Sequence, residues 1–138
     1  MAFEGLGALG QIHVSVTDFE RSVGFYRDLL GLHLLFQVPD QEMAFLDCDG
    51  VRLYLGKAES AEFRSTPLLY FRVDDIAEAY EALRERRVRF TSEPHVVHRT
   101  DTTELHVAFF TDPDGTHLGL MSEVVRAPET AEDDAGAG

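Results

Sequence analysis

The residue with the clearest capacity for chemistry is His13, which interrupts the alternating apolar segment QIHVSV at residues 11–16. An imidazole has a reference pKa of about 6.5, so it can take up or release a proton at neutral pH. Two phenols, Tyr54 and Tyr70, stand in other alternating segments. Phenols in an apolar trough can donate hydrogen bonds to a developing oxyanion, so His13, Tyr54 and Tyr70 are the candidate catalytic residues.

An internal duplication predicts the elements that position these residues. Residues 12–26 align with 69–83, and each segment is an alternating strand followed by an Asp and an amphipathic helix. Residues 49–57 align with 114–122, and each segment is a turn followed by an alternating strand. The sequence therefore predicts a βαβββ unit that occurs twice. The second copy is longer, and its polar stretch 98–104 predicts a longer hairpin loop.

The period of the apolar residues predicts where the elements of each copy lie. Asp18 and Asp75 stand at helix starts, and Gly31 ends the first helix. Pro67 and the polar residues before it form the linker between the copies. After the helices, the expected strands are 32–38, 42–47 and 51–56 in the first copy, and 88–90 with 94–98, 105–111 and 116–122 in the second.

Strand alternation predicts which side chains line a ligand site. Ile12, Val14 and Val16 should lie under the helix, which leaves Gln11 and Ser15 beside His13 on the opposite face. This face is richer in Tyr and His than a face that merely contacts water. It suits a small organic ligand with acidic or hydrogen-bonding groups. The expected substrate-binding residues are Gln11, Ser15, Arg52, Arg72, His106 and His117.

Two segments carry a family resemblance: QIHVSVTDFERSVGFYRDLLGL near the start and AFFTDPDGTHLGLMSEV near the end. With the duplicated order, they resemble the glyoxalase / bleomycin-resistance / extradiol dioxygenase superfamily, also called vicinal oxygen chelate. The resemblance implies an α+β fold, in which two tandem βαβββ modules form a concave, partly closed mixed sheet with helices outside. It also implies a homodimer, because proteins on this fold often pair two chains.

Metal-dependent members of that superfamily place ligands at positions that correspond here to His13, Tyr54, Tyr70 and Gly119. Only His13 fits, because phenols near pH 7 are protonated and glycine has no side chain. We therefore expect no metal and no other cofactor.

A displaced metal site is an open alternative to this expectation. Glu42 and His106 occupy matching places on the third strand of each copy if a one-residue bulge is allowed. With His13 they would form a set of two His and one carboxylate that suits Fe, Zn or Mn.

Charge and composition exclude several partners. A net charge of −13 repels nucleic acid and anionic membrane surfaces. No apolar run approaches a membrane span and the first residues do not resemble a signal peptide, so we expect a cytoplasmic protein. The single cysteine, Cys48, is expected to be a buried apolar residue. The acidic segment 126–138 is expected to be a disordered tail, which leaves one domain over residues 1–125 with modules at about 8–66 and 67–125.

Three functions are compatible with these residues. The first is a lyase or isomerase that acts next to a carbonyl without the usual metal. The second is a metal-free protein that binds and sequesters its ligand, as drug-resistance members of the superfamily do. The third is a metal-dependent glyoxalase-like enzyme with the displaced site. The sequence does not identify the ligand.

Overall fold

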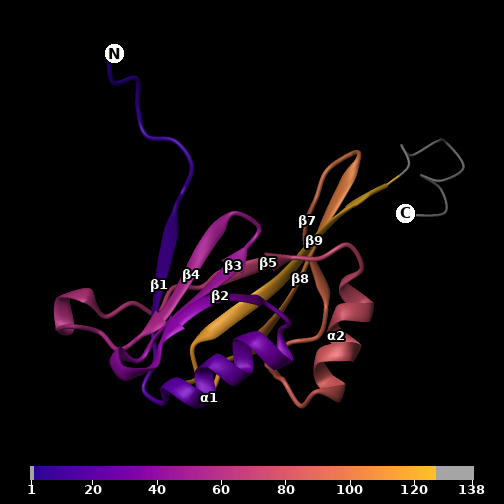
Figure 1. Cartoon of the computed structure of the whole chain (residues 1–138). Helices are drawn as coiled ribbons and strands as arrows, with labels where there is room; N and C mark the ends of the chain where they lie inside the picture. The colour runs from indigo at the N-terminus through magenta and orange to yellow at the C-terminus, as the bar shows by residue number, and fades with distance from the viewer. Residues whose placement is uncertain (1, 127–138) are drawn as a thin grey trace, which may run out of the picture. The chain divides into compact units, whose positions relative to one another are not determined.

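The structure is a computed structural model that describes residues 2–126 of the chain (Figure 1). The chain forms two compact units, and the boundary lies at Pro67, where the sequence predicts a linker. The turn Pro113–Thr116 belongs to the second copy by sequence but packs with the first unit. There the Asp114 carboxylate accepts hydrogen bonds from the hydroxyl and the backbone N–H of Thr17, the latter at 3.2 Å. The expected acidic tail lies outside the described residues, apart from Arg126.

The first unit contains a four-stranded sheet, called sheet A here, in the order β1-β4-β3-β2. Strands β1 and β4 are parallel, and the other neighbours are antiparallel. On the face toward helix α1, Val14, Ala44 and Leu55 form a fully buried row. The strand bounds are β1 Gln11–Ser15, β2 His33–Val38, β3 Met43–Cys48 and β4 Val51–Gly56.

The first helix changes its winding along its length. It begins as α1 (Phe19–Gly24) and continues as a π-helical turn, η1 (Phe25–Leu29). Gly31 has a φ of +79°, which a glycine adopts without steric cost, and the chain turns there so that Leu32 N–H donates to Tyr26 O at 3.0 Å. Gly31 therefore ends the helix as predicted, but the π-helical turn was not predicted.

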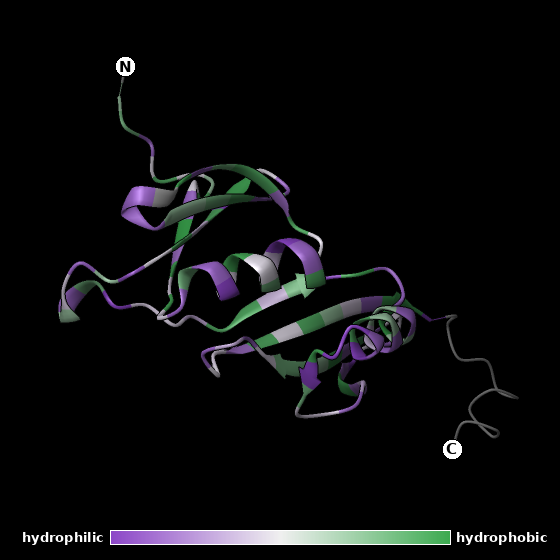
Figure 2. Cartoon of the chain, turned by 60° about the horizontal axis from the view of Figure 1, so that its bottom comes forward, coloured by the Kyte–Doolittle hydropathy of each residue, from purple (hydrophilic) through white to green (hydrophobic). Residues whose placement is uncertain are grey.

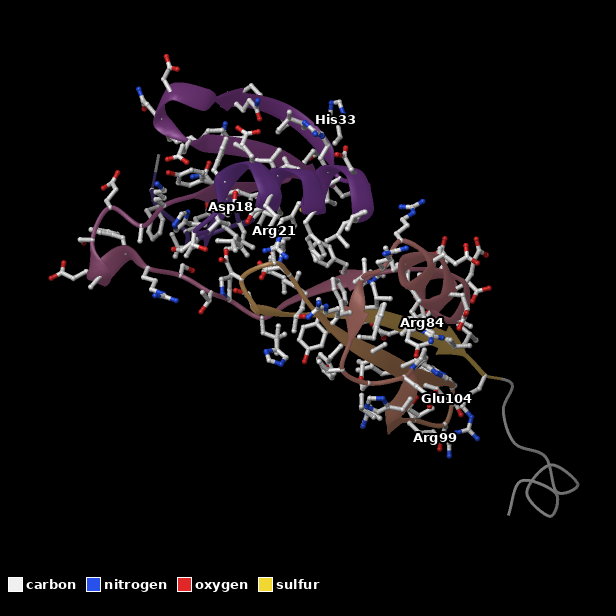
Figure 3. The ribbon with its side chains drawn as sticks, turned by 90° about the horizontal axis from the view of Figure 1, so that it is seen from below. Asp18, Arg21, His33, Arg84, Arg99 and Glu104 are labelled. Carbon is white, nitrogen blue, oxygen red and sulfur yellow. The ribbon has the colours of Figure 1, made fainter. Side chains whose placement is uncertain are left out.

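Both long helices begin in the same way. The Asp18 carboxylate accepts a hydrogen bond from Arg21 N–H at 3.3 Å, and Figure 3 shows the two residues at the start of α1. Asp75 caps α2 (Ile76–Glu85) by accepting from Glu78 N–H at 3.1 Å. Each side chain satisfies a backbone donor that the first turn of a helix leaves unpaired. The duplication is therefore visible in local structure as well as in strand order.

The second unit contains sheet B, in the order β5-β9-β8-β6, with β7 also paired to β8. Its first and last strands, β5 and β9, are parallel, as β1 and β4 are in sheet A. The tandem βαβββ prediction is thus confirmed, with β6 and β7 sharing the place of β2. The strand bounds are β5 Leu69–Arg72, β6 Arg89–Phe90, β7 His95–Arg99, β8 Thr103–Thr111 and β9 His117–Val125.

The long loop expected at residues 98–104 is mostly strand. Strand β7 continues to Arg99 and β8 begins at Thr103, so only residues 100–102 form the turn. The Thr100 hydroxyl accepts from Thr103 N–H at 2.9 Å, and Arg99 pairs with Glu104 at 2.8 Å across the strands (Figure 3). The polar residues that suggested a loop therefore close a hairpin instead.

Two short 3-10 helices, η2 (Pro39–Gln41) and η3 (Ala61–Phe63), lie in connections of the first unit. In Figure 2 the strands are mostly apolar, whereas the helices α1 and α2 carry polar segments beside apolar ones. This distribution is typical of helices that cover one face of a sheet. Neither helix in the described part of the chain has the length and apolar character needed to cross a membrane.

Candidate functional site

A row of four rings crosses all four strands of sheet A on its open face, the face turned away from α1. Strand pairing places His13 beside Tyr54, Tyr54 beside Phe45, and Phe45 beside Phe36. Successive ring centroids are 4.6, 4.9 and 4.5 Å apart, and the last two pairs are stacked. We call these four residues the ring row. The row ends at Phe36, whose exposed ring offers an apolar surface on which a flat molecule can pack.

The ring row lies between two rows of different character on the same face. On one side the register aligns small and aliphatic residues, namely Ser15, Gly56, Met43 and Val38. On the other side it aligns polar residues, namely Gln11, Arg52, Asp47 and His33. The Tyr54 ring leans over Gly56, since a Cβ at Gly56 would lie 2.7 Å from a Tyr54 ring carbon. Glycine at this position therefore lets the ring lie across the strand.

Hydrogen bonds hold the edge of the His13 ring. Its Nε2 lies 3.0 Å from Ser15 Oγ, and that same Oγ accepts a hydrogen bond from Ser65 N–H at 2.9 Å. The Ser15 oxygen has a second lone pair and a proton, so it pairs with Nε2 in either tautomer of the imidazole. Nδ1 is buried without a hydrogen bond of normal geometry. Both ring nitrogens of His13 are therefore already engaged or enclosed.

Burial shifts the acid–base behaviour of this pair. Desolvation lowers the pKa of His13, and the backbone of Tyr54 and the carboxylate of Glu59 oppose that effect without cancelling it. Desolvation also raises the pKa of the Tyr54 phenol, and Glu59 adds to this shift. Both groups are consequently neutral at pH 7, and the phenol can donate a hydrogen bond.

Arg52 holds the positive charge of the polar row. Its guanidinium carbon lies 5.4 Å from the centroid of the Phe45 ring, which is within cation–π range. Within residues 2–126, no carboxylate forms an ion pair with Arg52, whereas Lys57 pairs with Glu42 at 2.9 Å. The Arg52 side chain is exposed. A cation therefore stands beside the ring row with its hydrogen-bond donors available.

Sheet B carries a shorter version of this arrangement on the face turned away from α2. Strand pairing aligns Tyr70, Gly119 and Phe109. The rings of Tyr70 and Phe109 meet edge to face at 5.7 Å over Gly119. A Cβ at Gly119 would lie 3.1 Å from the Tyr70 ring and 3.2 Å from the Phe109 ring. Two aromatic side chains thus occupy the space that a side chain at position 119 would need.

The other predicted residues of the second unit divide between the two faces of sheet B. Arg72 and His117 share the face of Tyr70 by strand alternation, and Arg72 lies 3.8 Å from Glu123. His106 does not share it, contrary to expectation, because it pairs with Ser122, one position out of phase with the Phe109–Gly119 pair. It contacts Glu104 at 3.1 Å instead.

Glu104 holds His106 and Arg99 together on that opposite face. Burial opposes ionisation of Glu104, but hydrogen bonds from His106 and Arg99 outweigh it and lower the pKa of the carboxyl group. His106 therefore belongs to a polar cluster of the hairpin rather than to the face that carries Tyr70.

The residues at the superfamily's metal-ligand positions do not fit a divalent cation. His13 Nε2 is bonded to Ser15, the pKa of Tyr54 is raised, and position 119 offers no donor atom. The displaced set is not assembled either. Glu42 lies before β3 with a φ of +51° and pairs with Lys57. Over residues 2–126 no three His, Cys, Asp or Glu side chains come together in an arrangement that could hold a metal ion.

Sequence reasoning missed the phenylalanines of both sheets. Phe36, Phe45 and Phe109 were not among the expected ligand-binding residues. Phe45 and Phe109 lie on the third strand of their copies, whose phase alternation alone does not decide, and Phe36 lies on the second strand after a bulge. The aromatic residue in each third strand was the available indication. Phe45 is only 8% exposed and contacts the rings of Tyr54 and Phe36. Its ring on β3 therefore links the ring on β4 to the ring on the edge strand β2.

The duplicated order of strands and helices matches a known protein family. The sequence profile of the Glyoxalase/Bleomycin resistance protein/Dioxygenase superfamily matches residues 8–120. The chain belongs to this superfamily. The resemblance stated from the sequence is thereby confirmed.

Among superfamily relatives, the uncharacterized protein YraH of Bacillus subtilis (strain 168) is 33% identical over 119 residues, covering 75% of this chain and 89% of YraH. The crystal structure of TnmS3, an antibiotic-binding protein from Streptomyces sp. CB03234, is similar with a TM-score of 0.70. It is 23% identical and covers 88% of this chain and 100% of TnmS3. Lactoylglutathione lyase from Agrobacterium tumefaciens has a TM-score of 0.69 and 17% identity, with coverage of 86% and 95%. Both structural likenesses show the fold alone.

Proposed function

We propose that this chain is a binding protein that holds a flat organic molecule against the ring row of sheet A, without a divalent metal. The observation that carries the proposal is the unbroken series of four rings across the sheet. Phe36, at the outer end of the row, is 47% exposed. Exposed apolar surface next to convergent polar groups is typical of a ligand site, because its burial by a ligand is favourable.

The state of His13 supports binding rather than turnover. A general base must offer a nitrogen to the substrate, but Nε2 is bonded to Ser15 and Nδ1 is buried. Ser15 is itself fixed by Ser65, whose carbonyl accepts from Ser15 N–H at 2.7 Å. His13 thus acts as the first ring of the row, and its polar atoms stabilise the edge of β1. The antibiotic-binding role of TnmS3 is in keeping with this proposal.

A lyase or isomerase is the second candidate, and one observation favours it. The lowered pKa of His13 keeps the imidazole neutral at pH 7, as a base requires. The substrate would have to replace the Ser15 hydroxyl at Nε2, and the Tyr54 phenol would then be the nearest donor from the ring row. Lactoylglutathione lyase has the same fold.

The binding proposal is tested with 2-naphthamide, a flat neutral probe whose fluorescence can be followed because the chain contains no Trp. Phe36→Ala removes the exposed end of the row and should weaken binding about tenfold, the effect of losing one stacking partner and its apolar area. Phe63→Ala is the matched control, because Phe63 is exposed on η3 in the same unit but makes no ring contact. Equal affinity of the parent protein and the Phe36→Ala variant would refute the site.

The two candidates are separated at His13. For a binding protein, His13→Gln should retain affinity within about tenfold, because one neutral hydrogen bond contributes only about 0.5–1.5 kcal/mol. For an enzyme, His13→Gln and His13→Ala should both lower turnover by about 10²–10⁴-fold. Chromatography of each bound probe after prolonged incubation shows whether any turnover occurs.

A further inference from the structure

We infer that the molecule bound on the ring row is an aromatic anion whose acidic group is held by Arg52. This inference rests on the proposed function, since it specifies the ligand of the same site. Arg52 and Tyr54 are two positions apart on β4, so both side chains leave the same face of sheet A. The Phe45 ring connects them, because it stacks on Tyr54 at 4.9 Å and lies under the Arg52 guanidinium at 5.4 Å.

The contact with Phe45 keeps the Arg52 charge at the edge of the stacked rings. A guanidinium is weakly hydrated and lies readily on aromatic surfaces, while its N–H groups still point outward. A carboxylate or sulfonate attached to a flat ligand would meet those groups in the plane where Arg makes paired hydrogen bonds. A ligand ring packed on the exposed Phe36 and an acidic group at Arg52 would be satisfied together.

Neighbouring acidic groups leave Arg52 available. Asp47 is its cross-strand neighbour, yet the Asp47 carboxylate accepts from Gly50 N–H at 3.0 Å in the β3–β4 turn. On sheet B, by contrast, Arg72 lies 3.8 Å from the carboxylate of Glu123.

The charge of Glu59 acts on two members of the ring row, His13 and Tyr54. Its charge raises the pKa of Tyr54 and opposes the fall in the pKa of His13. A negative charge therefore acts on the His13 and Tyr54 rings, while Arg52 supplies the positive charge of the polar row. The acidic group of a ligand is favoured at Arg52, where its charge meets the guanidinium. An aromatic cation, which would be drawn toward Glu59, is the competing ligand class.

Three probes of one shape test the inference: 2-naphthoate, which is an anion at neutral pH, 2-naphthamide, which is neutral, and 2-naphthylmethylamine, which is a cation. We expect 2-naphthoate to bind about tenfold more tightly than 2-naphthamide, as one charge-assisted contact at an exposed site allows. Arg52→Gln should abolish that preference, so that 2-naphthoate and 2-naphthamide bind the variant equally. Arg27→Gln, which removes the same charge from the exposed Arg27–Asp28 pair on η1, should preserve the preference. Raising the salt from about 0.05 to 0.5 M should reduce it.

The outcomes distinguish this inference from the proposed function. If all three probes bind equally and Phe36→Ala weakens all of them, the site stands and the anion inference is overturned. Preferential binding of 2-naphthylmethylamine overturns it as well. If no probe binds, both proposals fail. Light scattering on the parent protein and on both variants covers the remaining case: a change of molecular mass in Arg52→Gln or Phe36→Ala would mean that a second copy of the chain covers this face, which also overturns the inference.

Discussion

Sheets A and B have the same strand order but opposite solutions at the centre of their open faces. In sheet A, the strand that pairs with β1 carries Tyr54, and the rings lie roughly flat on one another, with interplanar angles of 15° and 24° at the two stacked pairs. In sheet B, the equivalent position is Gly119, and Tyr70 meets Phe109 at 73° across it. The Tyr54 ring at the centre of sheet A thus continues the stacked ring row, whereas Gly119 at the centre of sheet B lets the rings on either side meet over the strand.

The difference assigns different roles to two halves that arose as one pattern. The ring row of sheet A leaves Phe36 exposed. The pair on sheet B fills its own gap and removes the position from which some superfamily members offer a metal ligand. The departure at Gly119 is therefore a packing arrangement as well as a lost donor atom. Duplication preserved the backbone, and side-chain volume at one central position changed what each face can do.

The largest expected effect on stability comes from removing the ring of Phe45, which lies between two other rings of the ring row. Phe45→Ala should lower the free energy of unfolding by about 3 kcal/mol, because Phe45 is buried between two stacked rings. The equivalent Phe109→Ala should cost about half as much, because Phe109 is half-buried and contacts one ring. Denaturant unfolding followed by circular dichroism measures both. Equal losses would mean that the two faces are packed alike.

A smaller effect is expected from adding one carbon to sheet B. In Gly119→Ala the new Cβ would lie 3.1 and 3.2 Å from two rings, so both must shift by a few tenths of an ångström. We expect a loss of about 1 kcal/mol, because overpacking costs about 1–3 kcal/mol and alanine recovers part of it through backbone entropy. Phe109→Leu in the same chain should restore most of the loss by making room. A stabilised Gly119→Ala protein would show that the rings do not hold this space.

The smallest effect is the contribution of His13 in sheet A to the pH dependence of folding stability. Desolvation lowers the pKa of His13 in the folded protein below its ordinary value of about 6.5, so the unfolded chain binds protons more readily as the pH falls. Folding stability contributed by neutral His13 is therefore present above about pH 6.5 and is lost as the pH falls through the lowered value. His13→Gln should have a flatter stability profile between about pH 7 and 5, measured by denaturant midpoints. An unchanged slope would place His13 in an environment like water.

Local chemistry made the helix ends and part of the open face predictable. Asp18 and Asp75 are caps because a carboxylate can pair with the N–H groups that start a helix, a contact within one turn of the chain. Gly31 ends its helix because the left-handed conformation there suits glycine. The open-face positions of His13 and Tyr54 followed from alternation in strands with clear apolar residues. The π-helical turn at Phe25–Leu29 had no such local indication.

The third strand of each copy shows where sequence reasoning stopped. Alternation gives two possible phases, and a shift of one residue exchanges the faces. Here Glu42 takes a left-handed conformation before β3, and bulges interrupt the pairing beside Leu34 and between Val96 and His98. Phe45 consequently joins the ring row, while His106 lies on the opposite face from Tyr70.

The sequence by itself determined the duplicated βαβββ order, the superfamily, the helix ends and the face on which His13 lies, because each depends on period or on contacts between near neighbours in the chain. Only the tertiary structure decided that Phe36, Phe45 and Tyr54 stack as a row, that Arg52 rests on Phe45, and that two rings close over Gly119. Those contacts join different strands, and their register depends on the packing of the whole sheet rather than on any one segment.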